Sequence, residues 1–233
     1  DLYHIVFNGE IYNFKELKKE LKDHGHEFQS EGDTEVLLAG YKIFGKQILH
    51  KLIGQFAFVI ADFKKRTIFM ARDRIGLKPL YYSIDENHLV FSSELNAIQK
   101  SGMINFCPNK EGYLSYLRHL AIPGDETGNK NVKKVLPGEF IEVDFHGSYT
   151  KEIYWDPLNY ISEEDISLSE AKEEFDNLLK SSIEYRKISD VEVGLYLSGG
   201  LDSTLIGSLL SSDTKLKSFN VDYDEVFEGY KGE

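Results

Sequence analysis

Apolar and polar positions alternate with changing period along the first part of the chain. Residues 3–7 are mostly apolar and β-branched, which predicts a strand that ends at the turn pair Asn8-Gly9. Apolar residues then recur at helical spacing, with Asn13 in the position of a helix N-cap and Gly25 where the helix would stop. The chain is therefore expected to open with a strand followed by a helix.

A second helix is predicted from Asp33, as its cap, to Gly45, at its end. The pattern then changes to short β-rich runs, which occupy residues 55–63, 67–73, 79–85 and 88–94. Short polar segments separate these runs, so we expect antiparallel strands joined by tight turns. A further short helix fits residues 111–120. Helices on either side of such strands would make a layered α+β domain.

After a polar stretch with the composition of a linker, the pattern becomes that of an α/β protein. Ser167 and Glu170 form a capping box ahead of apolar residues at helical spacing. A strand over 191–197, a loop over 198–203, a helix over 204–212 and a strand over 216–223 follow in order. This order predicts one βαβ unit of a parallel sheet.

Composition narrows the class of protein. The 233 residues are 41% apolar and 13% aromatic, which is enough to fill the core of one large or two ordinary domains. A formal net charge of -12 argues against nucleic acid or an anionic membrane as the main partner. One cysteine, Cys107, excludes an internal disulfide, and the sequence carries no export or membrane signal, so a cytoplasmic location is expected.

The stretch "LYLSGGLDST" carries the clearest chemistry. A glycine-rich turn between a strand and a helix exposes backbone N–H groups beside the positive end of the helix dipole, where anions bind. Gly199 and Gly200 would let phosphate oxygens approach, and Ser198 and Ser203 could donate further hydrogen bonds. Because the lysine of a Walker loop is absent, we expect the turn to grip a pyrophosphate and leave the α-phosphorus open, as adenylation requires. The alternative is a tight strand-helix junction with a solvated Asp202.

The sequence also resembles a known family. "SGGLDS" resembles the pyrophosphate loop of the ATP pyrophosphatase superfamily, and "FNGEIYN" is similar to the glutamine-binding loop of class II glutamine amidotransferases. With "RDRIGLKPLYY", "SSELNAI" and "LPGEF", the whole chain resembles glutamine-hydrolysing asparagine synthetases. The resemblance implies a glutaminase domain over 1–157 with Ntn-hydrolase-like antiparallel sheets and flanking helices, a linker over 158–168, and over 169–233 the start of an α/β parallel-sheet nucleotide-binding domain.

The resemblance assigns roles around the first loop. Asn8, through its side-chain amide, and Gly9, through its backbone N–H, would stabilise the oxyanion formed when glutamine is hydrolysed. Glu10 and Asp33 would hold the α-ammonium group of glutamine as charge-assisted partners. The structural alternatives are a plain turn for Asn8-Gly9 and a helix cap for Asp33, and a cap and a ligand role can coexist.

The resemblance likewise assigns the nucleotide site. Ser198, Gly199, Gly200, Leu201, Asp202 and Ser203 would bind the pyrophosphate of ATP, and Asp202 would act through Mg²⁺. Val221 would contact adenine, or would be an ordinary buried strand residue. The implied cofactors are ATP and Mg²⁺, and the implied small-molecule substrates are glutamine, aspartate and ATP, with no nucleic acid or membrane partner. A homo-oligomer stays open.

The sequence departs from the family at its start. The family's nucleophile is an N-terminal cysteine, which Asp1 cannot replace, so the chain is expected to be a fragment that does not hydrolyse glutamine by itself. Two rivals keep parts of this interpretation: a related amidotransferase with another acceptor, such as a surface-polysaccharide sugar, a peptide or a β-lactam precursor, and a non-catalytic nucleotide-binding fragment. Arg72, Asp73 and Lys78 are expected to form surface ion pairs or to lie at the domain boundary.

Overall fold

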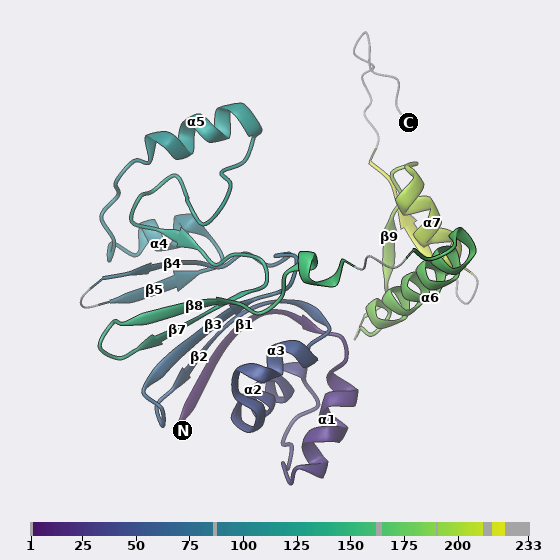
Figure 1. Ribbon diagram of the computed structural model, residues 1–233, viewed down its shortest axis with the longest axis horizontal. Coiled ribbons are helices and arrows are strands. Elements are labelled where there is room, and N and C mark those ends of the chain that lie inside the picture. Colours follow the sequence, from purple (N-terminus) through teal and green to yellow (C-terminus); the bar gives the residue numbers. More distant parts are fainter. Residues whose placement is uncertain (1, 86–87, 162–164, 190, 212–215, 222–233) are drawn as a thin grey trace. The chain divides into compact units, whose positions relative to one another are not determined.

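The computed structural model describes residues 2–85, 88–161, 165–189, 191–211 and 216–221. The chain divides into two compact units, Asp1–Ile161 and Ser162–Glu233 (Figure 1). In the described part of either unit, every helix is too short or too polar to cross a membrane.

In the first unit a five-stranded and a three-stranded sheet lie between helices (Figure 1). The larger sheet is antiparallel, in the order β1 (Tyr3–Ile11), β2 (Gly54–Asp62), β3 (Thr67–Arg72), β7 (Glu139–Asp144) and β8 (Tyr149–Ile153). The smaller sheet has the order β5 (Leu89–Ser92), β4 (Tyr81–Ile84) and β6 (Lys133–Lys134). Beside the larger sheet lie α1 (Phe14–Asp23), α2 (Asp33–Phe44) and α3 (Ile48–Lys51), and a 3-10 turn (Gly45–Gln47) precedes α3 (Figure 1). Beside the smaller sheet lie α4 (Leu95–Lys100) and α5 (Lys110–His119) (Figure 1).

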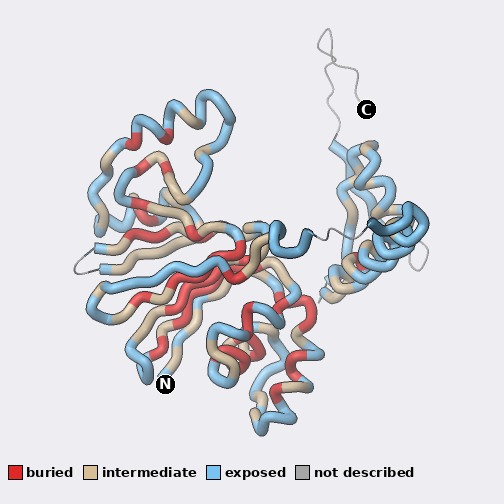
Figure 2. Tube along the Cα trace, in the orientation of Figure 1, coloured by how far each residue is buried: buried red, intermediate tan, exposed pale blue. Residues whose placement is uncertain are grey.

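The two faces of the larger sheet bury two separate apolar clusters. Phe56, Phe58 and Ile60 of β2 face the cluster that includes the inner sides of α1, α2 and α3. Ala57 and Val59 alternate with them and face the cluster shared with the smaller sheet. Figure 2 shows buried residues concentrated along these central strands. The layered α+β fold predicted for this region is confirmed.

The predicted turn at Asn8-Gly9 is wrong. β1 continues through both residues to Ile11, and Asn8 and Gly9 pair with Ala57 and Phe56 of β2. Turn chemistry suggested an end to the strand, but pairing with a strand far along the chain holds these residues extended. Both residues therefore lie inside a sheet.

Two predicted helix caps also differ from the structure. Asn13 stands at the N-cap position of α1 but makes no capping bond. Its side chain instead bridges the Lys51 carbonyl and the Ile53 amide. Gly32, not Asp33, is the N-cap of α2. The glycines predicted to end the two helices are confirmed. Gly45 is the C-cap of α2, and Gly25, just after α1, has the positive φ of 83° typical of a helix end.

The predicted hairpins are only partly right. β2 pairs with β3, and β4 pairs with β5, in antiparallel register. The segment 74–78, predicted to be a tight turn between neighbouring strands, instead crosses from the larger sheet to the smaller one. The turn predicted at 86–87 lies outside the described residues.

Arg72 and Asp73 hold the 74–78 segment through bonds to its backbone. The prediction that they form surface ion pairs is therefore wrong. The guanidinium of Arg72 donates to three carbonyl oxygens, those of Gly76, Lys78 and Val135. Asp73 is 1% exposed, and its carboxylate accepts from four backbone amides, those of Phe56, Ile75, Leu77 and Lys78. This loop is therefore built on bonds to the backbone.

The second unit contains α6 (Leu168–Arg186), β9 (Gly194–Tyr196), α7 (Leu201–Leu210) and β10 (Lys217–Phe219), after a 3-10 turn at Pro157–Tyr160 in the first unit. The capping box of Ser167 and Glu170 is confirmed. β9 and β10 pair in parallel with α7 between them in sequence, as the βαβ pattern predicts. Both strands are shorter than expected, and α7 begins at Leu201, inside the stretch predicted to be loop.

Candidate functional site

The first candidate site lies on β1, an edge strand of the larger sheet. Asn8 and Glu10 are two residues apart and so share one face of the strand. The Asn8 amide nitrogen Nδ2 donates to Ser93 Oγ over 3.1 Å, across 85 residues of sequence. Glu10 is exposed on the same face. The contact with Ser93, directly after β5, holds the Asn8 amide in one orientation.

Gly9 is required by the close approach of two backbones. A Cβ added at Gly9 would lie 2.1 Å from the Gln55 carbonyl oxygen, and φ at Gly9 is +150°. The same closeness recurs two pairs along, where a Cβ on Gly54 would lie 2.3 Å from the Glu10 carbonyl oxygen. These contacts fix the backbone on both sides of the Asn8 side chain.

Asp33 reaches the same strand from the start of α2. Its Oδ2 accepts a hydrogen bond from the Ile11 amide at 3.0 Å. The structure therefore brings the Asp33 carboxylate to Ile11, the residue that follows Glu10 in β1. The carboxylates of Glu10 and Asp33 can bind a cationic group, and the Asn8 amide and the Gly9 backbone N–H can donate hydrogen bonds to an oxygen atom.

Sequence reasoning missed two residues that shape this site. Ser93 binds Asn8, and Asn13 ties the segment after β1 to residues 51–53. The signal for Ser93 was its place in the block "SSELNAI", which suggested a family but no contact. No local pattern could have paired Asn13 with a turn so far along the chain.

The second candidate site is the turn between β9 and α7. Gly199 has φ of +82°, a conformation that favours glycine, and Gly200 is the N-cap of α7. The amides of Leu201, Asp202 and Ser203 stand in the first turn of α7, where no carbonyl precedes them in the helix. These N–H groups and the helix dipole make this end of α7 suited to an anion.

The two serines of this turn bind each other rather than pointing outward. Their hydroxyl oxygens are 3.1 Å apart, and Ser198 Oγ accepts from the Gly200 amide at 3.3 Å. Ser203 Oγ accepts from the Ser198 amide at 3.3 Å and donates to the Gly200 carbonyl at 3.2 Å. Two of the amides expected to face a phosphate are thus turned toward serine hydroxyls.

The remaining predicted residues are exposed. Asp202 projects from the first turn of α7, and the described residues include no group of three or more metal-ligating side chains. One carboxylate matches the way Mg²⁺ is held when substrate phosphates supply the other oxygens. Val221 is 69% exposed and lies beyond the end of β10 at Phe219. The rest of the predicted strand, 222–223, lies outside the described residues.

Two family models match successive parts of the chain. Residues 1–155 match the family model for the glutamine amidotransferase domain, and residues 174–232 match that for asparagine synthase. Asparagine synthetase [glutamine-hydrolyzing] 1 of Bacillus subtilis is 35% identical over 97% of this chain and 35% of its own length. A putative asparagine synthetase [glutamine-hydrolyzing] 2 of Methanocaldococcus jannaschii is 35% identical over 96% of this chain and 44% of its own length.

Among solved structures, glutamine phosphoribosylpyrophosphate amidotransferase from B. subtilis is 20% identical, with a TM-score of 0.47, over 94% of this chain and 45% of that one. The chain thus spans less than half the length of these relatives. The match over residues 1–155 nevertheless covers well over half of its 233 residues. The chain belongs to the glutamine amidotransferase domain family.

Proposed function

We propose that this chain belongs to an ATP-dependent asparagine synthetase that hydrolyses glutamine and transfers the ammonia to adenylated aspartate. The observation that carries the proposal is the succession, in one chain, of a glutamine amidotransferase match and an asparagine synthase match. We assign residues 1–157 to the glutaminase domain, 158–168 to a linker and 169–233 to the start of the nucleotide-binding domain. The curated relatives bear names that agree with this function.

In the glutaminase domain, Asn8 and Gly9 form the oxyanion hole. The Nδ2 of Asn8 and the backbone N–H of Gly9 stabilise the negative oxygen of the tetrahedral intermediate, and one such donor typically contributes about 10²–10³ in rate. The Ser93 contact at 3.1 Å supports this role because it orients the Asn8 amide before glutamine arrives. Ser93 is a positioning residue in this scheme.

Glu10 and Asp33 bind the α-ammonium group of glutamine. Asp33 uses one oxygen, Oδ2, to accept from the amide of Ile11, the residue that follows Glu10 in β1. Two carboxylates give a charged end of the substrate a fixed place, which orients the side-chain amide toward Asn8 and Gly9.

In the second domain, the turn from Ser198 to Ser203 binds the pyrophosphate of ATP, and Val221 contacts adenine. The positive φ of Gly199 and the free first turn of α7 support the assignment. For an anion to use the Ser198 and Gly200 amides, the serine hydroxyls must exchange their mutual contacts for phosphate oxygens. Mg²⁺ held by Asp202 would neutralise phosphate charge during adenylation.

The acceptor is tested in the complete protein. With glutamine, ATP and Mg²⁺ supplied, aspartate should drive the formation of AMP, pyrophosphate and asparagine in equal amounts. A complete protein that forms AMP only with a sugar, a peptide or a β-lactam precursor would overturn the choice of aspartate and support a related amidotransferase.

The glutamine contacts are tested by calorimetry on the complete protein, with the nucleophile blocked. Asp33→Asn and Glu10→Gln should each weaken glutamine binding about tenfold or more, because each removes a charged partner of the ammonium group. Glu27→Gln removes an exposed carboxylate elsewhere and should change nothing. Equal affinity in all three variants would contradict the assignment.

The nucleotide contacts are tested in the same protein. Asp202→Asn should weaken Mg²⁺-dependent ATP binding about tenfold, whereas Glu173→Gln, an exposed acid on α6, serves as the control with the same charge change. If Asp202→Asn binds ATP as the unaltered protein does, the metal assignment is wrong.

A further inference from the structure

A cavity in the first unit lies outside the proposed glutamine site. It has a volume of about 560 Å³ and is bounded by β4, β8 and the segments around 103–105 and 125–133. Asn8, Glu10 and Asp33 are not among its lining residues. This volume is within the range of pockets that bind metabolites.

The hydroxyl of Tyr82 is the unsatisfied group in this cavity. Tyr82 is 3% exposed, and its ring packs in the apolar cluster between the two sheets. Its buried oxygen makes no well-formed hydrogen bond among the described residues, although the Lys151 ammonium is near enough to act on its pKa. An oxygen atom of a ligand would give this hydroxyl a full partner.

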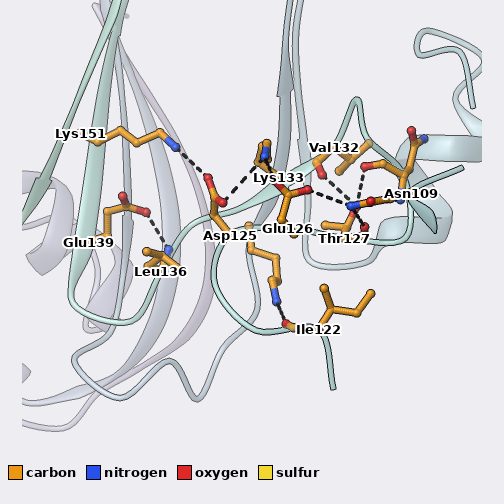
Figure 3. Close-up of polar contacts among 12 residues, drawn as sticks. Asn109, Ile122, Asp125, Glu126, Thr127, Val132, Lys133, Leu136, Glu139 and Lys151 are labelled. Atoms are coloured by element: carbon orange, nitrogen blue, oxygen red, sulfur yellow. Dashed lines mark hydrogen bonds and ion pairs between the residues drawn. The ribbon is translucent and has the colours of Figure 1, made fainter. Parts of the chain in front are cut away.

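Lys151 lies near Tyr82, and Lys133 lies near Lys151 through a shared aspartate. The Lys151 ammonium lies 5.4 Å from the Tyr82 ring centroid and 3.3 Å from Asp125. Lys133 approaches Asp125 from the other side at 3.8 Å and also pairs with Glu126 (Figure 3). Each ammonium carries three N–H donors, so Lys151 keeps donors beyond its contact with Asp125.

The lining is rich in groups that can donate to an anion. Lys130, Lys133 and Lys151 line the cavity with two aspartates, Asp85 and Asp125, and Glu126, which pairs with Lys133, balances the remaining positive charge. The amides of Asn105 and Asn131 line the same cavity.

The donors keep their protons at neutral pH. Burial raises the pKa of the Tyr82 hydroxyl. Burial works to lower the pKa of Lys151, but Tyr82 and Asp125 outweigh it and the pKa is raised. The pKa of Lys133 is raised, first by its bond to Glu126. All three groups therefore stand ready to donate to an acceptor.

We propose that this cavity binds a small oxyanion, a carboxylate or phosphate group of a metabolite, with the Tyr82 hydroxyl and the Lys151 ammonium as its principal donors. Lys133, held by Asp125 and Glu126, supplies a further N–H donor. The site is separate from glutamine hydrolysis and ATP binding, and stands whether or not those assignments hold.

The test uses inorganic phosphate and succinate as probes, titrated into the chain by calorimetry at constant ionic strength set with sodium chloride. Saturable binding of at least one probe is expected. Tyr82→Phe keeps the ring and removes the hydroxyl, and Lys151→Gln removes the charge, so each should weaken binding about tenfold or more. Lys19→Gln, on the exposed side of α1, makes the same charge change and should bind as the unaltered chain does.

Each outcome decides the proposal. Binding of phosphate alone or of succinate alone, lost in Tyr82→Phe, supports the site and identifies which oxyanion it takes. Circular dichroism of Tyr82→Phe verifies that the fold is intact. No saturable binding of either probe, or equal binding by Tyr82→Phe and the unaltered chain, overturns the proposal.

Discussion

The two candidate sites are held in place in different ways. On β1, Asn8 bonds to Ser93 across 85 residues, and Asp33 bonds to Ile11 across 22. In the turn before α7, the hydroxyl contacts join residues only two to five positions apart. The first site therefore depends on the tertiary fold, whereas the second depends on local backbone conformation.

The first unit also buries more apolar side chains than the described part of the second unit. The first unit buries two apolar clusters between its layers. In the described part of the second unit, the buried apolar residues are Ile183 and Leu210, while Phe175 and Leu178 of α6 are more than 60% exposed (Figure 2). We expect substitutions in the first unit to act on its whole stability and those in the turn to act locally.

The largest effect is expected from Asp73→Ala. The substitution leaves four backbone amides without their carboxylate and should lower the free energy of unfolding of the first unit by about 4 kcal/mol. Trp155, the only tryptophan of the chain, lies in the first unit, so its fluorescence during urea unfolding reports that unit.

Asp144→Ala is the matched control for Asp73→Ala. Asp144 accepts from two amides, but in the exposed turn after β7, so water can replace the carboxylate and the loss should be about 1 kcal/mol. Equal losses for the two variants would show that the buried carboxylate of Asp73 has no special weight.

Gly9→Ala should destabilise the first unit by about 3 kcal/mol. The added methyl group would overlap the Gln55 carbonyl, and alanine is strained at φ of +150°. Gly32→Ala is the control, because a Cβ there meets open space at a φ of -77°. A Gly9→Ala chain with an unchanged urea midpoint would mean that β1 and β2 can separate without loss.

The same contrast explains what could be predicted from sequence. The capping box of Ser167 and Glu170 and the strands from 54 to 72 follow from signals within a few residues, and the structure has them. The turn after β9 also follows from its two neighbouring glycines, and Gly199 has a positive φ there. Local rules sufficed for these elements.

Two of the failures concern residues with distant partners. Asn8-Gly9 has the composition of a turn, but β2 pairs with it and keeps it extended. Asp33 has the residue type of a helix cap, but its carboxylate binds the amide of Ile11 instead. In both cases the competing partner is brought close only by the fold, so no window of sequence contains it.

Gly199→Ala should have a smaller and local effect. Forcing alanine to φ of +82° costs about 1–2 kcal/mol, which should raise amide hydrogen exchange in the first turn of α7. The Trp155 unfolding transition should not move. Gly200→Ala, at φ of -73°, is the control. A shift of the Trp155 transition in Gly199→Ala would break the distinction between the units.

The smallest effect is expected from Glu35→Gln. It tests whether the loss of stability depends on how far apart in sequence the bonded residues lie, or only on their being in the first unit. Glu35 lies in α2, yet its carboxylate accepts from Gln29 and Ser30, only five to six residues away. The bonds from Ser30 and Gln29 lower the pKa of Glu35 below its usual 4.5.

The contribution of Glu35 to the free energy of unfolding is therefore complete above about pH 4.5 and is lost as the pH falls through the lowered pKa. Glu35→Gln should cost about 0.5 kcal/mol at pH 7, because the site is partly solvated, and less at pH 2.5. Urea unfolding followed by Trp155 at both pH values measures this difference, with Glu27→Gln as the control. A loss at pH 7 comparable to that of Asp73→Ala would show that membership of the first unit, rather than the span of the contact, sets the cost.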